Sequence, residues 1–242
     1  MATALARGWG EPVLVSDALP ERAEALAREV GGRALPSNIE VARSADAVVL
    51  CHKPAQLAEV AAEVAPVARA VVSILAATPV AELERAYSQV PVYRFLPNIP
   101  AEVGRGVLCY APGTRAGEGP ERALLELFGR LGVVIPLEEP LIEPAMALMS
   151  SGPAFLALVV EALADAGARH GLGAEDATRM TVETMAGTAA YLNRTERDAP
   201  ALRARVATPG GVTERGLEAL ERAGAREALG AAVDAVVEAT KR

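Results

Sequence analysis

The residues best suited to chemistry lie in RVATPGGVTERGLEALE, residues 205–221. Gly210 and Gly211 carry no side chain and let the backbone come close to a ligand. A helix that begins near Val212 points unpaired N–H groups and the positive end of its dipole at the same place. The pattern predicts a cup for a small anion such as a carboxylate, with the Thr213 hydroxyl beside it as a proton donor or relay.

The same turn has a plainer explanation, and Thr208 fits both. In the first interpretation Thr208 adds a second hydroxyl to the anion cup. In the second, the segment is an ordinary helix-turn-helix, in which the Gly pair ends one helix and Thr213 caps the next. The residue types alone leave both interpretations open.

An acidic residue, Asp17, ends the strand-like stretch EPVLVSD, residues 11–17. In a doubly wound α/β fold, an acid at the end of the second strand accepts hydrogen bonds from a ribose 2′-OH and repels a 2′-phosphate. No basic residue follows, since Ala18 and Leu19 come next. Asp17 therefore favours NADH over NADPH, although an ordinary strand-end or N-cap acid has the same appearance.

His52 and Lys53 follow a second strand-like stretch. A lysine of ordinary pKa donates a proton poorly at neutral pH, so we expect Lys53 to position a cofactor or backbone instead. His52 is expected to be an exposed or packed strand-end residue, with a proton shuttle as the alternative. The chain has two histidines and two cysteines, in no pattern with metal-ligand spacing, so no metal site is predicted.

The first half of the chain alternates short apolar runs with helical ones. Strands are predicted within residues 11–17, 45–52, 69–76, 90–97, 104–113 and 133–138, and helices within 19–32, 54–66, 79–88 and 117–132. Apolar strands separated by helices favour a mostly parallel sheet covered on both faces. The prediction is a Rossmann-type doubly wound sheet.

The usual beginning of that sheet is not recognisable. MATALARG, residues 1–8, resembles the latter part of the first helix, and neither a first strand nor a glycine-rich phosphate loop precedes it. Gly8 and Gly10 come before a strand rather than a helix, so they indicate a turn. An internal methionine of a longer natural protein would explain such a start.

From Leu141 onward the pattern is entirely helical, with helices predicted in 141–170, 174–193, 212–223 and 225–240. We place the domain boundary near Glu138–Glu143, with a dinucleotide-binding domain at 1–140 and an all-α domain at 141–242. Residues 154–168 are apolar nearly all round, so that helix must be buried in a large core or between subunits.

Composition limits the classes of partner. The net charge of −7 argues against nucleic acid or an anionic membrane. Apolar residues make up 51% of the chain, which favours burial in an oligomer. No uninterrupted apolar run reaches the roughly 18 residues of a membrane span. Cys51 and Cys109 are expected to be reduced, buried thiols. The first ten residues lack a signal peptide's apolar centre, so we expect a cytoplasmic protein.

Four segments in order carry a family resemblance. They are residues 37–54 (SNIEVARSADAVVLCHKP), 94–107 (RFLPNIPAEVGRGV), 150–172 (SSGPAFLALVVEALADAGARHGL) and 205–221. Together they are similar to the pyrroline-5-carboxylate reductases. The resemblance implies a dinucleotide-binding domain followed by an all-α dimerisation domain, in interlocked homodimers that often assemble into decamers. It also implies reduction of the cyclic imine 1-pyrroline-5-carboxylate to L-proline by NAD(P)H, with Thr213 catalytic at the imine nitrogen.

The resemblance also assigns site residues. Cofactor contacts are implied at Ser16, Asp17, Asn38, Cys51, His52, Lys53, Pro54, Ala76, Ala77 and Thr78. Substrate contacts are implied at Glu139, Glu196, Thr208, Gly210, Gly211 and Val212.

The sequence departs from the family pattern at Thr78, where a glycine is usual, at Cys51-His52, at Met149-Ser150 and at Arg205.

Two rival functions stay open. One is a related two-domain β-hydroxyacid dehydrogenase, which uses a junction lysine, but this chain has no lysine between Lys53 and Lys241. The other is a non-catalytic dimeric relative that acts as a binding or regulatory protein.

Overall fold

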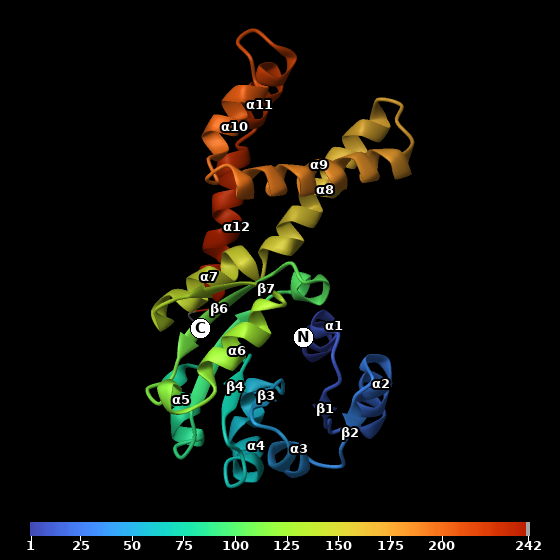
Figure 1. Ribbon diagram of the computed structural model, residues 1–242. Coiled ribbons are helices and arrows are strands. Elements are labelled where there is room, and N and C mark those ends of the chain that lie inside the picture. The colour runs from blue at the N-terminus through green and yellow to red at the C-terminus, as the bar shows by residue number, and fades with distance from the viewer. Residues whose placement is uncertain (241–242) are drawn as a thin grey trace. The chain divides into compact units, whose positions relative to one another are not determined.

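The computed structural model describes residues 1–240, which form two compact units (Figure 1). The first comprises Met1–Ser151 with Ala239 and Thr240, and the second comprises Gly152–Glu238. The units divide at Ser151 rather than at residue 140, because helix α7 (Ile142–Met149) packs into the first unit. Ile142 and Met149 are buried against residues of the sheet.

The first unit is built on a five-stranded sheet in the order β3-β4-β5-β6-β7. The strands are Val48–Leu50, Val71–Ser73, Val92–Pro97, Gly106–Pro112 and Gly132–Pro136. All neighbours are parallel except β5 and β6, which are antiparallel. The mostly parallel sheet predicted from the apolar runs is confirmed.

A separate parallel pair, β1 (Leu14–Val15) and β2 (Arg33–Ala34), precedes this sheet. In a doubly wound sheet the first strand lies between the second and fourth strands of the order 3-2-1-4. Within the described residues, β1 pairs with β2 and β3 pairs with β4, and no strand joins β1 to β3. In the part of the chain that the structure describes, the β1-β2 pair and the five-stranded sheet are therefore not hydrogen-bonded to each other.

Side chains of β5 alternate between the two faces of the sheet. Tyr93 and Phe95 pack beneath α1 (Ala2–Trp9) and α6 (Glu121–Gly129). Val92 and Leu96 lie on the opposite face. That face is covered by α3 (Asn38–Ser44), α4 (Leu57–Val64), α5 (Val80–Ala86) and α7. Short 3-10 turns complete the unit at Pro54–Gln56, Ile99–Val103, Ala116–Glu118 and Glu139–Leu141.

Helix α1 is fixed firmly to this unit. Leu5 is 1% exposed, and the Trp9 indole nitrogen donates to the carbonyl of Leu127 at 3.1 Å. The Trp9 ring meets Phe128 edge-on, with centroids 5.4 Å apart. Gly10 ends α1 in the left-handed conformation (φ 63°), which confirms its interpretation as a turn residue.

Helix α3 and strand β2 were not predicted from the sequence. α2 (Pro20–Val30) ends at Gly31 as the glycine pair predicted, and β2 follows directly. In SNIE, the Ser37 hydroxyl accepts from the backbone N–H of Glu40 at 3.2 Å and so caps α3. This serine-to-glutamate spacing is a recognised helix-start signal.

The second unit is all helical, with α8 (Gly152–Arg169), α9 (Ala174–Arg194), α10 (Ala199–Val206), α11 (Val212–Arg222) and α12 (Ala225–Thr240). The sequence predicted all but α10, which Asp198 caps by accepting from the N–H of Ala201 at 2.9 Å. Within the described part of this unit, only Ala164 and Ala177 are buried hydrophobic residues. The apolar helix 154–168 therefore exposes its side chains in the single chain.

The two cysteines differ in how far they are exposed. Cys109, in β6, is 2% exposed, as predicted, and burial raises the pKa of its thiol. The prediction of a buried Cys51 is wrong for the residue as a whole, which is exposed, but burial around its thiol raises the pKa of that group to about 12. Strand β3 ends at Leu50, so Cys51 lies beyond the covered part of the sheet.

One helical stretch, Glu139–Arg169, is long and apolar enough to cross a membrane by length and composition. This stretch was not predicted as a possible span, because only uninterrupted apolar runs were counted. A membrane span tolerates one or two charged residues. Only 11% of its most apolar window is buried inside the chain. A single helix of this kind is weak evidence for a span, because helices that proteins bury in their interiors have the same composition.

Candidate active site

Two of the predicted cofactor residues meet beyond β1. The Ser16 hydroxyl donates to Oδ1 of Asn38 at 2.8 Å, and Nδ2 of Asn38 donates to Glu63 at 2.9 Å. Asp17 is exposed, and its Oδ1 accepts from the N–H of Leu19 at 2.9 Å. The structure thus gives Asp17 a local turn-forming role, which is compatible with either interpretation made from the sequence.

The segment after β3 places His52 with a defined tautomer. Its Nδ1 lies 2.9 Å from the carbonyl oxygen of Lys53, and a carbonyl only accepts, so Nδ1 carries the proton. Nε2 is buried and has no hydrogen-bond partner in the described chain. The backbone N–H of Lys53 donates to Gln56 at 3.2 Å, and Pro54 opens the following 3-10 turn. The side chain of Lys53 is exposed.

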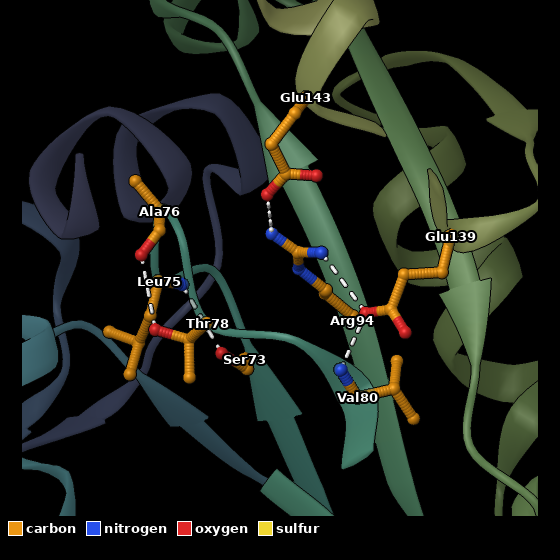
Figure 2. Close-up of polar contacts among 8 residues, drawn as sticks. All are labelled: Ser73, Leu75, Ala76, Thr78, Val80, Arg94, Glu139 and Glu143. Atoms are coloured by element: carbon orange, nitrogen blue, oxygen red, sulfur yellow. Dashed lines mark hydrogen bonds and ion pairs between the residues drawn. The ribbon is translucent and has the colours of Figure 1, made fainter. Parts of the chain in front are cut away.

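The third group of cofactor residues, Ala76–Thr78, forms the loop between β4 and α5 (Figure 2). Ala77 has φ 50°, a left-handed conformation that is unusual for a residue with a Cβ. Thr78 is 1% exposed, and its hydroxyl donates to the carbonyl of Ala76 at 3.1 Å. Before the loop, the buried Ser73 hydroxyl accepts from the N–H of Leu75 at 3.2 Å.

Glu139, predicted to contact substrate, lies beside this loop. Its Oε1 accepts from the N–H of Val80 at 2.5 Å and from Arg94 at 3.1 Å (Figure 2). Arg94 is 1% exposed, and its other terminal nitrogen pairs with Glu143 at 2.8 Å. Sequence reasoning missed Arg94. The one signal for it was a charged residue inside the otherwise apolar run VPVYRFLP.

The Asn-x-Pro segment has a structural role that the sequence did not suggest. Asn98 is 6% exposed, donates to the carbonyl of Met149 at 2.7 Å and accepts from the N–H of Val107 at 2.9 Å. One side chain therefore ties the end of α7 to β6.

In the second unit, the turn before α11 has the predicted form. α11 begins at Val212 with Gly211 as its N-cap, and Gly210 is left-handed (φ 76°). A Cβ on Gly211 would lie 2.8 Å from the Thr208 hydroxyl, so both glycines are required by the turn itself. Thr213 is exposed inside the first turn of α11.

The plainer interpretation of this segment, a helix-turn-helix, is wrong about the two capping residues. α10 ends on Ala207 rather than on the glycine pair, and Gly211, not Thr213, caps α11. The N–H of Gly210 donates to the Glu214 carboxylate at 2.6 Å. The turn therefore already binds a carboxylate oxygen.

Glu196 lies between α9 and α10, and it is exposed. Glu196 and Arg197 are both left-handed, with φ of 56° and 61°. Two consecutive non-glycine residues in that region make a sharp reversal that is unusual without a constraint. Together with Thr208–Thr213, Glu196 belongs to the second unit, whereas the predicted cofactor residues and Glu139 belong to the first.

Comparison with known proteins adds to this geometry. A family model described as pyrroline-5-carboxylate reductase dimerisation matches residues 139–242. A second, described as NADP oxidoreductase coenzyme F420-dependent, matches residues 1–77. The pyrroline-5-carboxylate reductase of Glycine max is 34% identical over 215 residues, which cover 88% of this chain and 77% of that protein. The chain belongs to the pyrroline-5-carboxylate reductase family.

Solved structures of the family agree in fold. A pyrroline-5-carboxylate reductase from Coxiella burnetii superposes with a TM-score of 0.89 at 27% identity, over 99% of this chain and 93% of that one. The Plasmodium falciparum pyrroline carboxylate reductase, solved with NADP bound, gives a TM-score of 0.87 at 24% identity, over 99% and 92%. A Rossmann-type unit followed by an all-α unit is thus the fold of the family.

Proposed function

We propose that the chain reduces 1-pyrroline-5-carboxylate to L-proline with NAD(P)H. Family membership over most of the chain supports this, and the Thr208–Thr213 turn leading into the N-terminus of α11 is compatible with it. The observation that carries the proposal is the 34% identity to a pyrroline-5-carboxylate reductase over 88% of this chain. At the N-terminus of α11, the Gly210 N–H, which here bonds the chain's own Glu214, is the group offered to the substrate carboxylate. The alternatives of a dehydrogenase with a junction lysine and of a non-catalytic relative are not favoured.

The residues at the strand ends suit the cofactor in part. When bound, NAD(P)H supplies hydride from C4 of its nicotinamide. Ser16 and Asn38 offer paired polar groups beyond β1, and the buried Nε2 of His52, unpartnered in the described chain, offers a further polar atom beyond β3. The exposed carboxylate of Asp17 is a candidate acceptor for a ribose 2′-hydroxyl, and the test below compares NADH with NADPH.

Residues of this chain provide the binding of the substrate carboxylate and the proton that the imine nitrogen receives. The imine carries a carboxylate, and the Gly210–Thr213 turn offers it backbone N–H groups in place of Glu214. Hydride adds to the carbon of the C=N bond, and a proton must reach the nitrogen. The Thr213 hydroxyl provides that proton as donor or relay, with Thr208 as a second hydroxyl. In this proposal Glu196 lies near the substrate.

We also propose a cytoplasmic homodimer, further assembled into decamers, with no membrane. The exposed apolar side chains of α8 include Leu156, Leu158 and Leu163. Residues 139–242 match a dimerisation model, so a partner subunit is the natural cover for this helix. Glu161 and Asp165 lie within α8, and a partner subunit accommodates such charges better than lipid does.

The test is oxidation of NADH and of NADPH by the chain with 1-pyrroline-5-carboxylate, for the unchanged protein and for Thr213→Ala. We expect kcat to fall about 100-fold or more in the variant, as for loss of a general acid. Thr188→Ala is the matched control, because the Thr188 hydroxyl bonds only its own helix in α9. Absence of turnover by the unchanged chain, or full activity of Thr213→Ala, contradicts the proposal.

A further inference from the structure

The side chain of Arg94 lies on the face of the sheet covered by α5 and α7, since its strand neighbours Tyr93 and Phe95 point to the other face. A guanidinium with 1% exposure is stable there only if its charge is paired. Glu139 and Glu143 supply that pairing at 3.1 and 2.8 Å. The buried charge therefore holds both carboxylates in fixed places.

Glu139 does more than neutralise Arg94. Helix α5 begins at Val80 after Pro79, which provides no side-chain cap. The first N–H of that helix is satisfied instead by Oε1 of Glu139, at 2.5 Å, from 59 residues further along the chain. A negative charge at a helix N-terminus is also favoured by the helix dipole. Glu139 thus acts as the cap of α5.

This cap fixes the exit of the Ala76–Thr78 loop. The loop leaves β4 through the Ser73–Leu75 hydrogen bond and enters α5 at Val80, two residues after Thr78 (Figure 2). Between these points Ala77 is held in a left-handed conformation, which persists only where the surroundings impose it. Ala76 and Ala77 are exposed while Thr78 is buried.

We infer that Glu139, oriented by Arg94, is a positioning residue for the Ala76–Thr78 loop and acts on cofactor binding. The inference rests on the proposed function, together with the cofactor contacts that the family resemblance implies at Ala76, Ala77 and Thr78. It differs from a direct substrate contact by Glu139, because the observed partners of its carboxylate are a buried arginine and the backbone of α5. Arg94 positions the loop only through Glu139.

The experiment compares Glu139→Ala, Glu139→Gln and Glu143→Ala. Glutamine keeps an acceptor for the Val80 N–H, whereas alanine removes it. Glu143→Ala is the matched control, since it removes the other carboxylate on Arg94 without touching the loop. We measure the Kd of NADH and NADPH by fluorescence, the KM of the imine, and hydrogen exchange at the amide of Val80 in the cofactor-free protein.

We expect Glu139→Ala to raise the cofactor Kd by about 10-fold, as other supporting residues do, and to leave the KM of the imine within about 2-fold. Exchange at Val80 should accelerate in Glu139→Ala, and both readouts should be restored in Glu139→Gln. Glu143→Ala should leave Val80 protected.

An increased KM of the imine with an unchanged cofactor Kd in Glu139→Ala would overturn the inference, as would a Val80 amide equally protected in all variants. The cofactor Kd and the exchange at Val80 are independent of turnover, whereas the KM of the imine requires it. If the unchanged protein binds cofactor but reduces no imine, the proposed function fails while the positioning role is still decided by Kd and exchange.

Discussion

At the scale of single residues, the site depends on side chains with unusual backbone or burial. Ala77 is left-handed, Arg94 is charged and buried, and His52 has a buried nitrogen without a partner in the described chain. Each condition has an energetic cost, and proteins keep such features mainly where the surroundings or the function require them. All three belong to segments at or beside the carboxyl ends of β3 and β4.

Replacing Ala77 by glycine should stabilise the protein. At φ 50° a Cβ costs about 1–2 kcal/mol, which exceeds the entropy that glycine adds to the unfolded chain. We expect a gain of about 0.5–1 kcal/mol in the free energy of unfolding, measured by urea denaturation. Ala76→Gly is the control, because Ala76 is not left-handed and should lose about as much stability. Destabilisation by Ala77→Gly would show that the loop is not strained.

Least could be predicted from the sequence at the scale of single residues. Ser16, Asn38 and Thr78 could be named from the family resemblance, and their hydrogen bonds could not. Arg94 was passed over because a strand pattern gives no partner for a charge 45 or 49 residues away. Burial and pairing of such a residue depend on tertiary contacts that no local pattern contains.

At the scale of elements, glycines and caps set where helices begin. Most helices and strands were predictable, because their apolar periodicity and flanking turn residues are local. β2 has only two residues, too few for a pattern to be seen. α3 and α10 are short helices whose capping residues, Ser37 and Asp198, were the only strong signals.

Gly210 precedes α11 and Gly216 lies within it, and replacing each by alanine should have opposite effects on stability. Gly210 is left-handed (φ 76°), so Gly210→Ala should destabilise the protein by about 1 kcal/mol and raise the KM of the imine. Gly216, inside the helix, has open space where a Cβ would lie. Gly216→Ala should therefore stabilise the protein by about 0.5–1 kcal/mol without changing KM. Thermal unfolding and steady-state kinetics of both variants test this prediction. Equal effects of the two substitutions on stability and on the KM of the imine would contradict it.

At the scale of the whole molecule, the two units differ in how much core they bury. The first contains three buried clusters on the two faces of its sheet. The described part of the second buries two alanines and exposes leucines along α8. The contrast could be anticipated from the all-round apolar pattern of residues 154–168, but a sequence does not say whether such a helix is covered by its own chain or by another.

Introducing a charge on α8 should break the proposed dimer. Leu158 is 64% exposed in the single chain, and Leu158→Glu places a carboxylate where we expect a partner subunit. The dissociation constant of the dimer should rise about 100-fold or more, measured by analytical ultracentrifugation. Val103→Glu is the control in the first unit, where Val103 is 74% exposed. An unchanged oligomer in Leu158→Glu would place the interface elsewhere.

The chain has a single tryptophan, and Trp9 lies in α1 against Phe128 and the carbonyl of Leu127. Its indole is therefore an intrinsic optical reporter of one junction, between the first helix and α6. Fluorescence follows the melting of the first unit alone, while circular dichroism is dominated by the helices of both. A difference between the two melting curves would reveal whether the units unfold in one cooperative step or in two.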